Sequence, residues 1–81
     1  MRIPRDLSGD DLASLLKRYD YVVTRQSGSH MRLTTQRGGE HHVTIQRHKA
    51  LRVGTLSNIL NDVAQHLGID REDLAKSLFE K

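Results

Sequence analysis

The spacing of apolar residues predicts a helix near the start of the chain. Ser8 and Asp11 have the spacing of a helix N-cap and the acidic residue that completes a capping box. The apolar positions that follow recur with helical spacing and form one stripe: Leu12, Leu15, Leu16 and Tyr19. We therefore expect a helix from Ser8 that ends near Tyr19 and Asp20.

The middle of the chain alternates between apolar and polar residues, as half-buried strands do. Three strands are expected, in residues 21–26, 30–36 and 42–46, separated by a Ser-Gly-Ser turn and a Gly-rich turn at 36–40. The residues expected to face the core are Met31, Leu33, Thr35, Val43 and Ile45. The residues expected on the solvent face are His30, Arg32, Thr34, His42, Thr44 and Gln46. The pattern predicts an antiparallel meander.

Two further helices are predicted after a basic connector at residues 47–52. Thr55 is the expected N-cap of the first, and Gly68 is placed to end it in the left-handed conformation. Its apolar stripe consists of Leu56, Ile59, Leu60, Val63 and Leu67. Asp70 then begins a short third helix that carries Leu74 and Leu78. The fold class expected is α+β: a three-stranded antiparallel sheet with helices packed on one face, in one domain over residues 1–81.

Composition narrows the class of protein. The 81 residues include no cysteine, which excludes a disulfide framework and a thiolate nucleophile. No stretch approaches the roughly 20 apolar residues of a membrane helix, and the N-terminus has no apolar core of a signal peptide. A cytoplasmic protein with no membrane partner is expected.

Positive charge is concentrated in the middle of the chain. The whole chain carries +3, yet residues 17–53 hold eight basic and two acidic residues, which is +6 and leaves −3 for the flanks. Four of the five histidines lie in the same segment: His30, His41, His42 and His48. This distribution favours a polyanionic partner, although charge alone equally allows basic side chains that only solvate exposed strands.

His30 is the candidate catalytic residue. It is the first strand residue after the Gly28-Ser29 turn, so its imidazole is both exposed and firmly placed. An imidazole there could take the proton of a ribose 2′-hydroxyl or give one to a leaving 5′-oxygen, as metal-independent RNA cleavage requires. The alternative is an ordinary surface histidine.

Three groups of residues together resemble the HicA family of toxin ribonucleases. They are the run YVVTRQSGSH at residues 21–30, Val43-Thr44-Ile45 followed by His48, and Gly54-Thr55-Leu56 followed by Ile59-Leu60. The similarity spans roughly residues 9–67. It implies a fold resembling a double-stranded-RNA-binding domain, catalysis by His30, messenger RNA as substrate, and neutralisation by a HicB-type antitoxin, with operator DNA contacted only through the antitoxin complex, if at all.

The expected RNA-binding residues combine this resemblance with charge. They are Arg25, Ser29, Arg32, Arg47, His48, Lys49 and Thr55. Many HicA proteins have a second histidine directly after the first, where this chain has Met31. The second proton-transfer group is therefore His48 as first candidate, His42 as the next, or water.

Other histidines are assigned no chemistry. His41 and His42 are adjacent on a strand and point to opposite faces, so no metal site and no cofactor are expected, and His66 is interpreted as structural. Few aromatic residues are available for stacking, which favours weak base selectivity. A non-catalytic RNA-binding module is the alternative function, and a structural partner that only docks another protein is a third.

Overall fold

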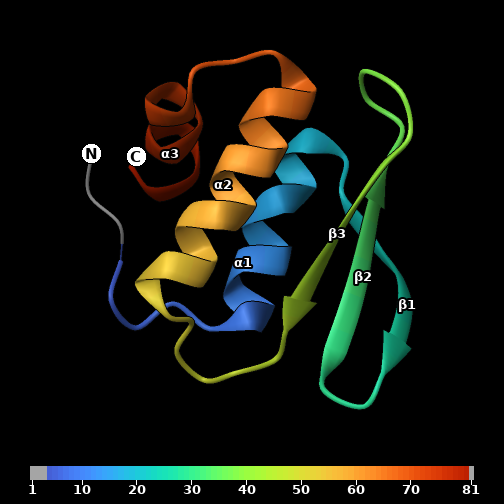
Figure 1. Cartoon of the computed structure of the whole chain (residues 1–81), viewed down its shortest axis with the longest axis vertical. Coiled ribbons are helices and arrows are strands. Elements are labelled where there is room, and N and C mark those ends of the chain that lie inside the picture. The colour runs from blue at the N-terminus through green and yellow to red at the C-terminus, as the bar shows by residue number, and fades with distance from the viewer. Residues whose placement is uncertain (1–3, 81) are drawn as a thin grey trace.

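Three helices and three strands follow one another in the predicted order in the computed structural model, which describes residues 4–80. The elements are α1 (Gly9–Leu16), a 3-10 turn (Lys17–Tyr19), β1 (Val22–Ser27), β2 (His30–Thr35), β3 (His41–Gln46), α2 (Val53–Leu67) and α3 (Arg71–Phe79). The sheet is antiparallel with strand order β1-β2-β3. The helices lie on one side of it (Figure 1), which confirms the expected α+β class.

The start of α1 is as predicted, but its end is not. The Asp11 amide donates to the Ser8 hydroxyl at 3.0 Å, and the Ser8 amide donates to the Asp11 carboxylate at 3.3 Å, so the capping box is complete. The α-helix stops at Leu16, and Tyr19 belongs to the following 3-10 turn. Asp20 then adopts a left-handed conformation with φ of 68°, which turns the chain toward the sheet.

A tight turn joins β1 to β2 and places His30 at the beginning of β2. Ser27 pairs with His30, which leaves a two-residue loop whose first residue, Gly28, has φ of 58°. A positive φ at the first loop position is what a type II′ hairpin turn requires. The register of β1 and β2 then shifts between Val23 and Arg25, a bulge that the alternation did not predict. The first strand also begins one residue later than expected, after the buried Tyr21.

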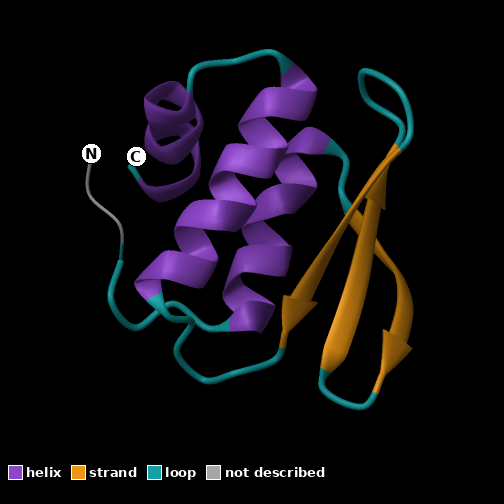
Figure 2. Ribbon diagram, in the orientation of Figure 1, coloured by secondary structure: helices purple, strands orange, loops and turns teal. Residues whose placement is uncertain are grey.

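The helices cover only one face of the sheet (Figure 2). On that face the predicted core residues are all buried: Met31, Leu33, Thr35, Val43 and Ile45. Of the residues predicted to be in solvent, Thr34 is the exception, with 9% of its surface exposed. It lies on the open face, but hydrogen bonds from its hydroxyl to Thr24 and His42 bring those side chains over it.

Helix α2 begins two residues before the predicted cap. Arg52, not Thr55, is the N-cap, and no side chain caps the helix there. The Leu56 amide donates to the Arg52 carbonyl at 2.9 Å, so Thr55 already lies within the first helical turn. The prediction failed because Thr55 has the side chain of a cap, whereas the extended backbone of Arg52, with φ of −66° and ψ of 143°, makes the turn into the helix.

The junction between α2 and α3 follows the prediction. Gly68 ends α2 with φ of 69°, and the Asp70 carboxylate accepts the Glu72 amide at 2.7 Å to begin α3. Helix α3 lies against the side of α2 that faces away from the sheet (Figure 1). Its Leu74 and Leu78 enter the same core as α1 and the strands. No helix within residues 4–80 is long and apolar enough to cross a membrane.

A close backbone contact joins the start of α1 to the end of β3. The Gly9 amide donates to the His48 carbonyl at 3.0 Å, and the Leu51 amide donates to the Leu7 carbonyl at 2.7 Å. A Cβ atom on Gly9 would lie 1.9 Å from the Gln46 carbonyl oxygen, a backbone atom that cannot swing aside. Only glycine therefore allows the two segments to approach this closely.

We predict that Gly9→Ala destabilises the fold by about 2 kcal/mol or more, because α1 must move away from β3. Gly54→Ala is the matched control, since no atom lies within 4 Å of a Cβ at that helical position. The control is expected to stabilise the protein by up to about 1 kcal/mol through helix propensity. Urea unfolding measures both, and equal midpoints for the two variants would contradict the packing argument.

Candidate functional site

His30 lies at the edge of the uncovered sheet face. It is exposed, and its partner across β3 is Gln46. The Gln46 side-chain nitrogen is 3.3 Å from His30 Nε2. In this arrangement the amide donates to an unprotonated Nε2, so a neutral His30 carries its hydrogen on Nδ1. This hydrogen bond occupies the lone pair of Nε2, so the nitrogen can act as a base only when the Gln46 amide turns away from it.

Residues paired across the three strands form rows on the open face, and the row next to that of His30 and Gln46 is cationic. Arg25 pairs directly with Arg32, and Thr44 lies on the other side of Arg32. Two residues of strand separate Arg32 from His30, which is about 7 Å. Within residues 4–80, neither arginine forms an ion pair with an acidic side chain. Like charges directly opposed on neighbouring strands repel each other, so the pair is favourable only where an anion binds between them.

A third row consists of hydrogen-bonded polar residues. The hydroxyls of Thr24 and Thr34 are 2.7 Å apart, and Thr34 Oγ1 is 2.7 Å from His42 Nδ1. His42 Nε2 donates to the Glu40 carboxylate at 2.8 Å. Thr34 is four residues from His30 on β2, which is about 13 Å. His42 is therefore tied to its neighbours and lies too far from His30 to act on the same phosphate.

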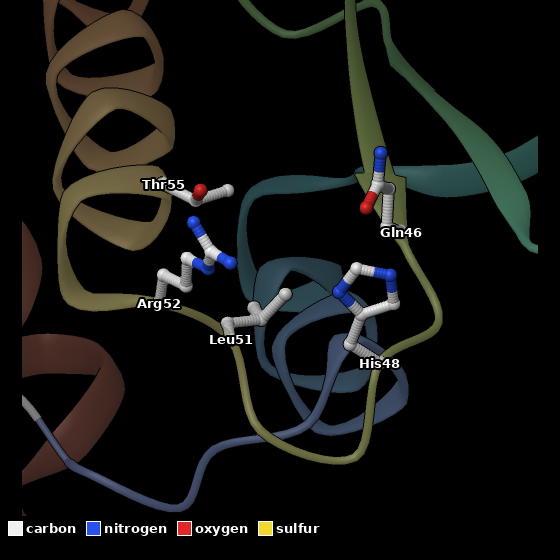
Figure 3. Close-up of a pocket in the computed structure, with 5 residues that line it drawn as sticks. All are labelled: Gln46, His48, Leu51, Arg52 and Thr55. Atoms are coloured by element: carbon white, nitrogen blue, oxygen red, sulfur yellow. The ribbon is translucent and has the colours of Figure 1, made fainter.

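A pocket of about 300 Å³ lies at the end of β3, where Gln46, the strand partner of His30, lines it (Figure 3). It is lined by Gln46, His48, Leu51, Arg52 and Thr55. Of the predicted site residues, His48 and Thr55 meet here. Gln46 and Leu51 were not predicted as site residues, and the signal that could have identified Gln46 is the strand register, which sets it opposite His30.

Besides Arg25 and Arg32 on the open sheet face, three predicted RNA-binding residues lie outside this pocket: Ser29, Arg47 and Lys49. The Arg47 guanidinium faces α1 and donates to both Asp10 carboxylate oxygens, at 2.9 and 3.1 Å. Its hydrogen bonds and ion pair with Asp10 raise the pKa of Arg47. The Arg47 amide donates to the Ser29 carbonyl at 2.7 Å, which fixes the turn before His30. Lys49 is exposed on the connector and does not line the pocket.

Two stacked histidines, His41 and His66, lie between the sheet and α2. The Tyr21 hydroxyl donates to His41 Nδ1 at 2.7 Å, and His41 Nε2 donates to Asp62 at 3.2 Å. The His41 ring stacks on His66 with centroids 4.3 Å apart. His66 Nε2 donates to the carbonyls of Arg37 and Gly39, both at 3.0 Å, and so holds the turn between β2 and β3. This confirms that His66 is structural.

The adjacent histidines 41 and 42 have separate environments, as the alternation predicted. His41 contacts α2 beneath the sheet, and His42 hydrogen-bonds to Thr34 on the open face. Across residues 4–80, no three histidine, cysteine, aspartate or glutamate side chains gather closely enough to hold a metal ion.

The fold and this face together define a small α+β protein with a histidine and two arginines on its uncovered sheet surface. Residues 9–65, more than half of the chain, match the family model described as the HicA toxin of bacterial toxin–antitoxin systems. The chain belongs to this family, which confirms the resemblance in its sequence, and a toxin of this kind has a cognate antitoxin. No curated protein and no solved structure matched the chain.

We predict that Tyr21 makes the free energy of unfolding decrease at alkaline pH. Burial first, and the Asp62 charge second, raise the pKa of Tyr21 from 10.0 to about 12. Because the folded state favours the neutral phenol, this contribution is complete below pH 10 and is lost as the pH rises from 10 to 12.

Urea unfolding of the wild type is expected to show this decrease in the free energy of unfolding between pH 10 and 12. In Tyr21→Phe the decrease is expected to be smaller. Phenolate absorbance, taken as wild type minus Tyr21→Phe, isolates the titration of this one residue. A midpoint near pH 10 in the folded protein would refute the assignment.

Proposed function

We propose that this protein is a toxin endoribonuclease that cleaves messenger RNA without a metal ion, with His30 as a catalytic residue. The observation that carries the proposal is the exposed imidazole of His30 beside the opposed Arg25 and Arg32. Membership of the HicA family supports the toxin role. RNA is a polyanion, and the uncovered sheet face offers it both charge and a proton acceptor.

Cleavage on this face uses the ribose as its own nucleophile. Once the exposed Gln46 amide has turned away from His30 Nε2, this nitrogen accepts the proton of the 2′-hydroxyl as that oxygen attacks the neighbouring phosphorus. The P–O5′ bond breaks, and the departing 5′-oxygen takes a proton from a second group. The products are a 2′,3′-cyclic phosphate and a 5′-hydroxyl. Arg25 and Arg32 stabilise the negative charge that builds on the phosphate oxygens.

His48 is the proposed second proton-transfer group. It lines the pocket that Gln46 also lines, and Gln46 contacts His30. His42 is disfavoured because Thr34 and Glu40 already occupy both of its ring nitrogens. Ser29, Lys49 and Thr55 remain proposed RNA contacts. Arg47 can join them only by leaving Asp10.

The antitoxin is proposed to be of the HicB type and to cover the open sheet face. An acidic surface laid over Arg25 and Arg32 would neutralise the charge that RNA needs and block access to His30. Contact with operator DNA would then come only through the complex. We also propose that residues 1–81 act as one domain, because α3, which lies beyond residues 9–65, packs into the common core.

Replacing His30 tests the catalytic proposal. His30→Ala is expected to lower RNA cleavage by about 10²-fold or more, because the other imidazole next to the Arg25–Arg32 row, that of His42, is hydrogen-bonded through both nitrogens. Folding and RNA affinity are expected to be retained. Purified protein, end-labelled RNA and excess EDTA provide the measurement. Full activity of His30→Ala would refute the catalytic role, and RNA binding without any cleavage by the wild type would indicate a binding module.

The second proton-transfer group is tested by comparing two histidines. His48→Gln is expected to lower kcat and to remove one limb of its pH dependence, because the leaving oxygen loses its acid. His42→Gln, whose side chain lies on another part of the sheet, is expected to change kcat little. Small and equal effects of the two substitutions would assign this proton transfer to water.

Salt dependence tests the phosphate contacts. Arg32→Gln is expected to reduce the slope of log affinity against log salt by about 1, since one phosphate contact is lost. Lys76→Gln on the exposed side of α3 removes the same charge far from the open face and should leave the slope unchanged. Equal slopes for the two variants would show that RNA binds elsewhere.

A further inference from the structure

The pocket beside His30 has the size and chemistry of a site for one unpaired base. We infer that it is a nucleobase subsite that selects bases with an exocyclic amino group, and that Gln46 makes this selection. This inference rests on the proposed ribonuclease function and adds to it a sequence preference, which the low aromatic content of the chain did not predict.

The dimensions of the pocket restrict the ligand. Its volume of about 300 Å³ lies at the lower end of the range for small-molecule sites. A base pair cannot enter such a space, but a base turned out of a single strand can. Gln46 lines the pocket and pairs with His30 across the strands, so a nucleotide next to the cleaved bond lies within reach of it.

The walls of the pocket suit the flat surface of a base. Leu51, with 4% of its surface exposed, supplies the apolar part. The guanidinium of Arg52 and the ring of His48 lie on either side of it (Figure 3). Bases stack on both of these planar groups, so the pocket needs no phenylalanine, tyrosine or tryptophan.

The Gln46 amide supplies selectivity. Its nitrogen donates a hydrogen bond to His30 Nε2, and its oxygen is turned toward the pocket (Figure 3). A carbonyl oxygen accepts hydrogen bonds and therefore favours the amino groups of adenine and cytosine, whereas uracil has a carbonyl in the corresponding position. The same oxygen disfavours a phosphate. The open face already holds a phosphate seat at Arg25 and Arg32.

Binding to uncleavable RNA tests the subsite directly. Hexanucleotides of adenosine, cytidine or uridine with 2′-O-methyl groups lack the nucleophile, so the wild-type protein can be titrated with each by NMR. The methyl signals of Leu51 and Thr55 and the side-chain amide of Gln46 are expected to shift with adenosine and cytidine. Uridine is expected to bind about five-fold more weakly, which is the value of one hydrogen bond.

Matched glutamine variants separate the role of Gln46 from general effects. Gln46→Leu is expected to equalise the three affinities and to scatter the cleavage positions in a mixed-sequence RNA. Gln65→Leu, which replaces another exposed glutamine near the C-terminal end of α2, should keep the wild-type preference. Retained base preference in Gln46→Leu would overturn the inference.

The remaining outcomes distinguish the subsite from the proposed function. If all three hexanucleotides bind equally and shift only Arg25 and Arg32, the pocket is no base subsite, but the RNA-binding face stands. If cleavage occurs without base preference, the inference again fails alone. If no hexanucleotide binds and the mixed-sequence RNA is not cleaved, both the inference and the ribonuclease proposal are wrong.

Discussion

The contact between Gly9 and the end of β3 determines how the helical layer meets the site. Because Gly9 has no Cβ, the first turn of α1 can lie directly against the Gln46 carbonyl and donate to that of His48. The connector is thereby held by α1 on one side, while its Arg47 amide bonds the turn before β2 on the other. One set of backbone contacts thus positions both the pocket and the strand end that carries His30.

The uncovered sheet face is held together by hydrogen bonds and strand pairing instead of apolar burial. Arg25 opposite Arg32 works against folding, and Val22 and Val23 remain 52% and 45% exposed on the edge strand. Leu33, on the opposite side of β2, is fully buried. The fold therefore draws its stability from one face and leaves the other free for charge that favours an anionic partner.

Features that depend on near neighbours in the chain were predictable. The capping box at Ser8, the end of α2 at Gly68 and the turn at Gly28 each follow from a few consecutive residues. Strand alternation also separated His41 from His42, because successive side chains point to opposite faces. The errors were local as well: Thr55 has the side chain of a cap, but the backbone entered the helix earlier.

The sequence by itself determined the elements, the buried face and the exposure of His30, since periodicity and turn chemistry act over short distances. Only the tertiary structure decided its partners. Gln46 meets His30 through a strand register, and Arg47 turns to Asp10, which is 37 residues away in the chain. The pocket likewise needs a strand end, a connector and a helix together. Such contacts arise from packing between distant segments, which no local pattern specifies.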